Sequence, residues 1–268
     1  MLESLQVQLK QANVRTYWYY TAMNQSIRPT PETSAAPSPA VARPRRRLLP
    51  PRERTAAINR RLAEITPHPS TALHHENPLQ LLIATILSAQ CTDERVNQVT
   101  PRLFARYRTA QDFAQADLKE LERIIRPTGY YRNKARHIRN CCAQLVERFG
   151  GEVPRTLEEL ITLPGIGRKT ANVVLGDAFG VPGITVDTHV KRLSRRLGLT
   201  RHTDPGKIEL ALMKLLPAAE WTLFSHRLIW HGRQVCRARK PRCDSCILND
   251  LCPKIGVQMV GPAKKTAR

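Results

Sequence analysis

Aromatic and acidic residues are both scarce in this chain of 268 residues, and long apolar runs are missing. Phe, Trp and Tyr together make up 5% of it, which argues against modules that bind nucleic acid on aromatic platforms. No apolar run reaches the length of about 18 residues that spans a bilayer. The amino terminus also lacks a basic region followed by an uninterrupted apolar stretch. We therefore expect a soluble, intracellular protein with no membrane partner.

The scarcity of acids leaves a strong excess of positive charge. The chain has 43 Lys and Arg against 22 Asp and Glu, a formal net charge of +21 and a pI of about 10.4. Such a charge is typical of proteins that bind nucleic acids. It does not indicate which nucleic acid is bound or what is done to it.

Both ends of the chain differ in composition from its middle. Residues 1–53 include a stretch rich in Pro, Ser and Ala with the basic triplet Arg45, Arg46 and Arg47, and we predict a disordered basic arm. An organelle transit peptide is an alternative, and Met23 is a second possible start. Residues 258–268 are predicted to form a basic tail.

Between these ends the apolar residues recur at helical spacing, and no convincing strand pattern is found. Leu79 to Gln90 is apolar nearly all round and is expected at the centre of a helical bundle. The predicted fold class is all-α. Shorter amphipathic helices are predicted at 118–125, 134–149, 207–216 and 219–230.

Four cysteines near the carboxyl end follow the pattern C-x6-C-x2-C-x5-C, namely Cys236, Cys243, Cys246 and Cys252. This spacing allows four thiolates to hold a metal centre, either zinc or a [4Fe-4S] cluster. The single close pair favours iron-sulfur, because structural zinc sites more often present two close pairs. Disulfides are the remaining alternative. The other cysteines, Cys91, Cys141 and Cys142, are expected to be buried small hydrophobes.

The loop between the first two cysteines is strongly basic. Four of its six residues carry positive charge, which suits contact with a polyanion such as the nucleic-acid backbone. A solvated surface loop is the simpler alternative. The candidate DNA contacts are Arg237, Arg239, Lys240 and Arg242.

The segment LPGIGRKTANVVL (163–175) predicts a tight glycine turn between two helices. Thr156 and Glu159 form a plausible capping box for the first helix, and Gly180 is placed to end the second. Gly165 and Gly167 permit positive φ and close backbone approach, so the turn amides can point at a phosphate. A helix-hairpin-helix grips DNA in this way. An ordinary αα-hairpin is the alternative.

Lys169 and Asp187 are the candidate catalytic pair. Lys169 lies in the first turn of the second helix, where the helix dipole disfavours a positive charge, and a neutral lysine amine is a nucleophile. Asp187, in the segment VDTH, precedes another helix. The pair suits covalent chemistry at a sugar C1′. The alternatives are a phosphate contact for Lys169 and an amino-terminal cap for Asp187.

Taken together, LPGIGRKTANVVL, VDTHV and the cysteine pattern resemble the endonuclease III family of DNA base-excision glycosylases, from about Arg54 to Cys252. The resemblance implies two helical domains with a DNA-binding cleft between them. One is a six-helix barrel with the helix-hairpin-helix, at 68–180. The other, at 54–67 plus 181–257, holds a [4Fe-4S] cluster.

The resemblance also implies a mechanism. Lys169 would displace a damaged pyrimidine and form a Schiff base, Asp187 would activate it or stabilise the sugar cation, and β-elimination would cut the strand 3′ to the lesion. Gln90 would fill the space left by the extruded base. Tyr130 stands where the best-known members carry a leucine wedge, and an aromatic can also intercalate.

The implied partner is duplex DNA with a damaged pyrimidine or an abasic site, and the protein is expected to be a monomer. It would be cytoplasmic, with the nucleoid, in a bacterium, and nuclear or mitochondrial in a eukaryote. Two other functions stay open. One is a monofunctional glycosylase of the same superfamily, although that family lacks a lysine at the position of Lys169. The other is a non-enzymatic iron-sulfur DNA-binding protein.

Overall fold

The described part of the protein is helical. In the computed structural model, residues 48–258 are described, and within them no β-strand occurs. The all-α prediction is therefore confirmed, whereas most of the predicted basic arm and tail lies outside the described residues. The helices are α2 (Pro51–Ile65), α3 (Pro78–Leu87), α4 (Asp93–Arg106), α5 (Ala110–Ala114), α6 (Leu118–Ile125), α7 (Tyr131–Phe149), α8 (Leu157–Leu160), α9 (Arg168–Phe179), α10 (Thr188–Arg196), α11 (Pro205–Met213) and α12 (Trp221–Gln234), with short 3-10 helices η1 (Arg126–Thr128) and η2 (Ala218–Glu220).

The first hydrophobic core is built around α3. Asn77 caps this helix through a hydrogen bond from the Gln80 N–H, and Pro78 occupies its first turn, where a missing N–H costs nothing. Every residue from Leu81 to Leu87 is buried. The helix packs against α9, α7 and α4, which explains why its sequence is apolar on all sides.

The predicted helix from Leu79 to Gln90 is three residues too long at its carboxyl end. The observed helix ends at Leu87, and Gln90 has a left-handed backbone with φ of 54°. Beyond Leu87 the chain continues with Ser88, Ala89 and Gln90, which offer no large apolar side chain to hold a further turn in the core. Gln90 consequently lies in a short exposed loop before α4.

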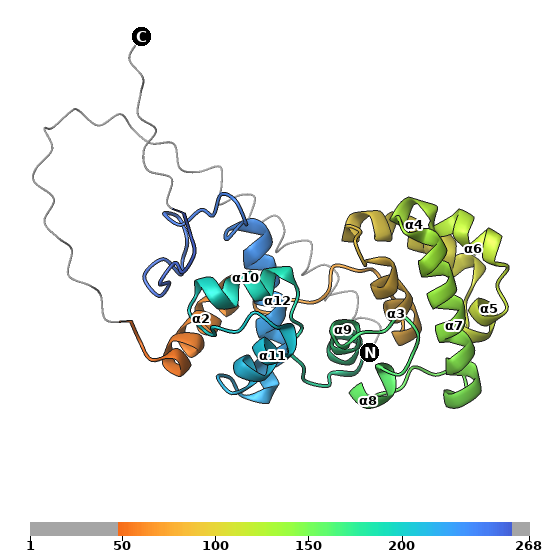
Figure 1. Ribbon diagram of the computed structural model, residues 1–268, viewed down its shortest axis with the longest axis horizontal. Helices are drawn as coiled ribbons and strands as arrows, with labels where there is room; N and C mark the ends of the chain where they lie inside the picture. The colour runs from red at the N-terminus through yellow and green to blue at the C-terminus, as the bar shows by residue number, and fades with distance from the viewer. Residues whose placement is uncertain (1–47, 259–268) are drawn as a thin grey trace, which may run out of the picture.

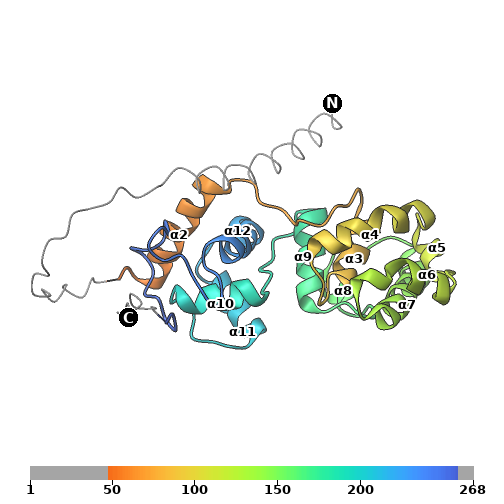
Figure 2. The ribbon, with the colours of Figure 1, turned by 90° about the horizontal axis from the view of Figure 1, so that it is seen from above.

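The second hydrophobic core joins segments that are far apart in the sequence. Ile58 and Leu62 of α2 are buried together with Phe224 and Leu228 of α12, and α12 packs on both α2 and α10. In Figures 1 and 2, α2 accordingly lies beside α10 and α12 rather than beside α3, its neighbour in the chain.

The remaining helix predictions were close, with shifts at their ends. Residues 118–125 match α6, whereas α7 begins three residues before the predicted Lys134. The helix α11 begins earlier than predicted, at Pro205, because Asp204 accepts a hydrogen bond from Lys207 N–H and caps it. The last helix, α12, is displaced toward the carboxyl end relative to 219–230, and α2 begins at Pro51 rather than Arg54.

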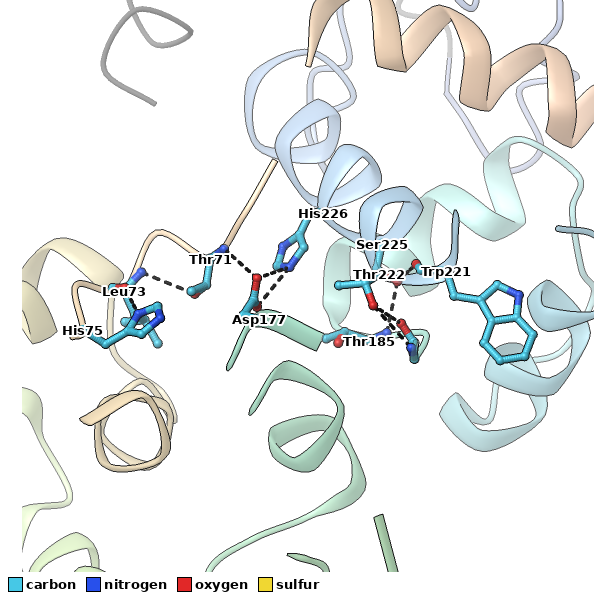
Figure 3. Close-up of polar contacts among 10 residues, drawn as sticks. Thr71, Leu73, His75, Asp177, Thr185, Trp221, Thr222, Ser225 and His226 are labelled. Carbon is cyan, nitrogen blue, oxygen red and sulfur yellow. Dashed lines mark hydrogen bonds and ion pairs between the residues drawn. The ribbon is translucent and has the colours of Figure 1, made fainter. Parts of the chain in front are cut away.

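The two cores meet where α9 faces α12 (Figure 3). The carboxylate of Asp177 on α9 lies 3.0 Å from His226 Nε2 on α12 and accepts a hydrogen bond from the backbone N–H of Thr71. Both Asp177 and His226 have side chains that are less than one tenth exposed. One carboxylate thus joins both cores and the segment of chain that crosses between them.

A second set of contacts holds the other crossing, residues 180–186. The Thr185 N–H donates to Ser225 Oγ, and the Gly183 N–H donates to Thr222 Oγ1 (Figure 3). These hydroxyl groups come from the face of α12 that also presents His226. The segment leading to Asp187 is therefore fixed.

None of the helices described within residues 48–258 combines the length and the apolar character that a membrane span requires.

Candidate active site and cysteine-lined pocket

The glycine turn predicted at residues 163–167 joins α8 to α9. Gly165 has φ of 80°, and a Cβ at this position would lie 2.8 Å from His137 Cβ, so glycine is required twice over. Gly167 differs from the expectation of positive φ. It has φ of −93° and caps α9 in an extended conformation. A Cβ there would meet nothing, so its place at the helix start leaves the backbone open to an approaching phosphate.

Lys169 is the second residue of α9, and its side chain is exposed. No hydrogen bond or ion pair engages its amine among residues 48–258. Asp187 caps α10 by accepting a hydrogen bond of 2.8 Å from the Val190 N–H, which is the alternative role that the sequence offered, and is half-buried. Capping uses one carboxylate oxygen and leaves the other for a second role.

A buried carboxylate that the sequence analysis missed fixes the helix that carries Lys169. Glu209 on α11 is buried and receives two hydrogen bonds from Arg168, of 2.7 and 3.0 Å. Asn172, one turn further along α9, donates to the same carboxylate and to the carbonyl oxygen of Ile184. This bidentate geometry is strong and directional. It ties the start of α9 to the segment that leads into Asp187.

The sequence contained one signal for Glu209. It lies between Ile208 and Leu212, in the part of its helix that faces the core, so a charged side chain there was a candidate for a paired buried acid. Its partner was not predictable, because Arg168 is 41 residues away.

The four carboxyl-terminal cysteines line one pocket. All four are free thiols, so the disulfide alternative is wrong. Among the described residues, no three His, Cys, Asp or Glu side chains are arranged to hold a single metal ion. Four cysteines that face one pocket are the ligand set of a [4Fe-4S] cluster. The apolar lining of the pocket includes Leu193, Leu197, Val235, Leu248 and Val257.

The chemistry of the pocket also fits a cluster. Burial raises the pKa of the Cys246 thiol to about 11 and raises the pKa of Cys252, so a thiolate there needs a bound cation. Donors already surround the sulfurs. Arg196 lies 3.4 Å from Cys236 Sγ, and the Lys254 N–H donates to Cys252 Sγ. Such donors stabilise sulfur ligands that carry negative charge.

The basic loop after Cys236 is fixed by its backbone, and its charged side chains face solvent. Arg196 donates to the carbonyl oxygens of Arg237 and Ala238, and Arg192 donates to that of Cys236. Both arginines come from α10. Exposed positive charge on a rigid loop suits contact with phosphates. All four predicted side chains are exposed, namely those of Arg237, Arg239, Lys240 and Arg242.

Gln90 and Tyr130 share an unusual backbone. Among the described residues other than glycine, only these two and Lys254 have positive φ, 54° at Gln90 and 48° at Tyr130. Both side chains are exposed, Tyr130 to 70%. A large exposed aromatic held in a strained conformation indicates a functional position rather than a packing one.

Comparison with known proteins places these features in one family. Residues 83–218 match the model of the HhH-GPD superfamily of base excision DNA repair proteins. Residues 236–252, from the first cysteine of the pocket to the last, match the iron-sulfur binding domain of endonuclease III.

Relatives and solved structures agree with both matches. Endonuclease III of Synechocystis is 55% identical over 209 residues, covering 78% of this chain and 95% of that protein. Endonuclease III of Escherichia coli K12 is 44% identical over 192 residues, covering 72% and 91%.

Among solved structures, a non-covalent endonuclease III–DNA complex superposes with a TM-score of 0.73 at 50% identity, covering 76% of this chain and 95% of that one. A trapped endonuclease III–DNA covalent intermediate gives the same score and identity and covers 76% and 96%. The chain belongs to the endonuclease III family of base-excision DNA repair proteins.

Proposed function

We propose that this DNA glycosylase and AP lyase removes damaged pyrimidines from duplex DNA and cuts the strand at the resulting abasic site, with Lys169 as the nucleophile. The enzyme carries a [4Fe-4S] cluster, and we assign its four ligands to Cys236, Cys243, Cys246 and Cys252. The catalytic proposal rests on Lys169, which is exposed, makes no hydrogen bond or ion pair within residues 48–258 and stands at a fixed helix start, and on Asp187, which caps the following helix in the chain.

The chemistry follows from these two side chains. The neutral Lys169 amine attacks C1′ as the N-glycosidic bond breaks, and the departing base leaves with the bonding electron pair and takes up a proton. The sugar ring opens to give a Schiff base on Lys169. Loss of a C2′ proton then expels the 3′ phosphate, and water releases the lysine. Asp187, with its free carboxylate oxygen, would take the amine proton or stabilise the developing sugar cation.

We assign phosphate contacts to the turn with Gly165 and Gly167 and to the basic loop. Gln90 and Tyr130 would enter the base stack once the damaged nucleotide has been extruded. We further propose that residues 68–180 and residues 54–67 plus 181–257 are the two domains, with DNA in the cleft between them, and that a monomer acts on one lesion.

Borohydride trapping tests the catalytic assignment. Duplexes that carry one thymine glycol or one abasic site are incubated with the intact protein and with Lys169→Ala. We expect covalent adducts on both duplexes with the intact protein and none with the variant. Lys191→Ala is the matched control, because Lys191 is also an exposed lysine in the first turn of a helix, and it should trap normally.

Other results would change the proposal in defined ways. Trapping by Lys169→Ala would remove Lys169 as the nucleophile. Trapping of the intact protein at the abasic site alone would leave the lyase assignment and exclude thymine glycol as the substrate. Size-exclusion chromatography with light scattering, with and without DNA, tests the monomer.

A further inference from the structure

Lys134 has an unusual environment for a lysine. It lies in the first turn of α7, its residue is 4% exposed, and its amine donates hydrogen bonds of 2.8 Å to two carbonyl oxygens, those of Leu87 and Thr128. No carboxylate pairs with it within residues 48–258. Lysine is almost never this buried without an acidic partner.

Keeping this amine in the interior is costly. Burial lowers the pKa of Lys134, because the charged form loses its water. The two carbonyl oxygens offset part of this cost. That of Leu87 belongs to the last turn of α3, where a cation is favoured by the helix dipole. A methionine of similar length would fill the space without desolvating a charge. The presence of a buried amine is therefore best explained by the two carbonyl groups that it holds together.

The two carbonyl groups that it connects belong to the loops of Gln90 and Tyr130. Leu87 is the last residue of α3, three residues before Gln90, and Thr128 ends η1, two residues before Tyr130. The backbone N–H of Lys134 also donates to the carbonyl oxygen of Tyr130, at 3.1 Å. One residue thus holds both loops, and it bonds to both sides of Gly129.

Both loops contain a strained residue, since Gln90 and Tyr130 have left-handed backbones. Such conformations persist only where the surroundings enforce them. Neither residue has its side chain packed in the interior, so enforcement must come through the neighbouring backbone. The Lys134 amine supplies a bond of this kind to each loop.

We propose that Lys134 is a positioning residue, which holds the Gln90 and Tyr130 loops in one fixed arrangement so that both side chains enter the base stack together. The inference rests on the proposed stack-filling role of those two residues. Lys134 itself is buried and touches no DNA. Its contribution is to the extrusion of a base from duplex DNA, not to the chemistry at C1′.

The test compares two substrates that differ only in the need to open a stack. One is a duplex with a single thymine glycol, and the other is the same thymine glycol strand without its complement. For Lys134→Met we expect the single-turnover rate on the duplex to fall about 10- to 100-fold, the range that small misplacements cause. The rate on the single strand should be unchanged. Lys134→Gln keeps N–H donors, so its rate on the duplex should lie between those of the intact protein and Lys134→Met.

A spectroscopic signal reports the same step without turnover. With 2-aminopurine placed opposite an abasic analogue, binding of the intact protein should raise the fluorescence as the stack is disturbed. Binding of Lys134→Met at saturation should raise it less. Thr85→Val is the control for loss of a buried hydrogen bond, because the Thr85 hydroxyl donates to the Leu81 carbonyl oxygen within α3. It should behave as the intact protein.

Equal loss of rate on both substrates, or no loss on either, would overturn the inference. If Lys134→Met does not fold, as judged by circular dichroism and the visible absorption of the cluster, Lys134→Gln carries the comparison.

The double variant Gln90→Ala/Tyr130→Ala separates the inference from the proposal beneath it. If it leaves duplex excision intact, the stack-filling role is wrong. If it slows excision and Lys134→Met does not, only the positioning role is wrong. If the stack-filling role and the positioning role are both right, adding Lys134→Met to the double variant should cause no further loss of duplex excision rate. The effects of residues that act through one another are not additive.

Discussion

Arg196 donates a hydrogen bond of 2.7 Å from its buried guanidinium to the carbonyl oxygen of Ala238. Arg196 is the last residue of α10, and Asp187 caps the first turn of the same helix. One helix therefore links the proposed catalytic carboxylate to the basic loop that follows Cys236. One end of the helix holds the loop through the Arg196 side chain, and the other end carries the proposed active-site residue Asp187.

Replacing Arg196 by lysine should loosen the basic loop. Lysine keeps the charge but cannot bond two carbonyl groups as a planar fork. We expect the affinity for a duplex with an abasic analogue to fall about 3- to 10-fold, or about 1 kcal/mol, as measured by fluorescence anisotropy. The neighbouring Arg195 is exposed, so Arg195→Lys should leave the affinity unchanged. Equal losses in both variants would contradict the role of Arg196.

Asp187→Asn should separate catalysis from capping. Asparagine is as good an amino-terminal cap as aspartate, so the melting temperature should stay the same while the single-turnover rate falls about 100-fold or more. Asp204→Asn is the matched control, because Asp204 caps α11 in the same way. It should retain full activity. Normal turnover by Asp187→Asn would reduce Asp187 to a cap.

Glu209→Gln should impair chemistry from a distance. The amide cannot form the charged, bidentate pair with Arg168, so the start of α9 and with it Lys169 should become less well placed. We expect a fall in kcat of about tenfold with little change in KM, and slower but complete borohydride trapping. Glu158 is exposed on α8, and Glu158→Gln serves as the control. A change in KM alone would point to DNA binding instead.

Cys246→Ser should remove the cluster and destabilise the segment around it. Three ligands and a serine hold iron poorly, and the visible absorption of the purified protein should disappear or be much reduced. Residues 236–252 should then exchange amide hydrogens rapidly. Cys142→Ala is the control, because burial raises the pKa of Cys142 and that thiol lies in the first core. Full absorption in Cys246→Ser would exclude Cys246 as a ligand.

The basic loop should contribute mainly through salt-dependent binding. Arg239→Ala/Lys240→Ala removes two exposed charges, and the slope of log K against log salt should fall by about 2, because each phosphate that is no longer neutralised lowers it by roughly one. Affinity should drop for all sequences alike. Lys119→Ala, an exposed lysine on α6, should not alter the slope. An unchanged slope in the double variant would show that the loop stays in solvent.

Local signals in the sequence were sufficient for much of this structure. The caps at Thr156 and Asp187, the helix end at Gly180 and the run of α6 follow from residues that act on their immediate neighbours. The capping box was only partly right, because the Glu159 carboxylate bonds to the Thr156 hydroxyl and not to its backbone N–H.

What the sequence did not reveal depends on contacts between distant segments. Glu209 receives its partner from another helix, and Lys134 reaches carbonyl groups 47 and 6 residues away. Periodicity reports which face of a helix is apolar, but it does not report which buried charges will meet.

The split composition of the second core has a consequence for biosynthesis. Ile58 and Leu62 lie at the beginning of the described chain, while Phe224 and Leu251 lie near its end. The first core needs only the residues between Leu73 and Leu175, so on the ribosome it can close while the later helices are still being made. The apolar face of α2 stays uncovered until α12 has been made. With Cys252 as a proposed ligand, the ligand set is complete only after Cys252 has emerged, so we expect cluster insertion to follow the closing of the first core.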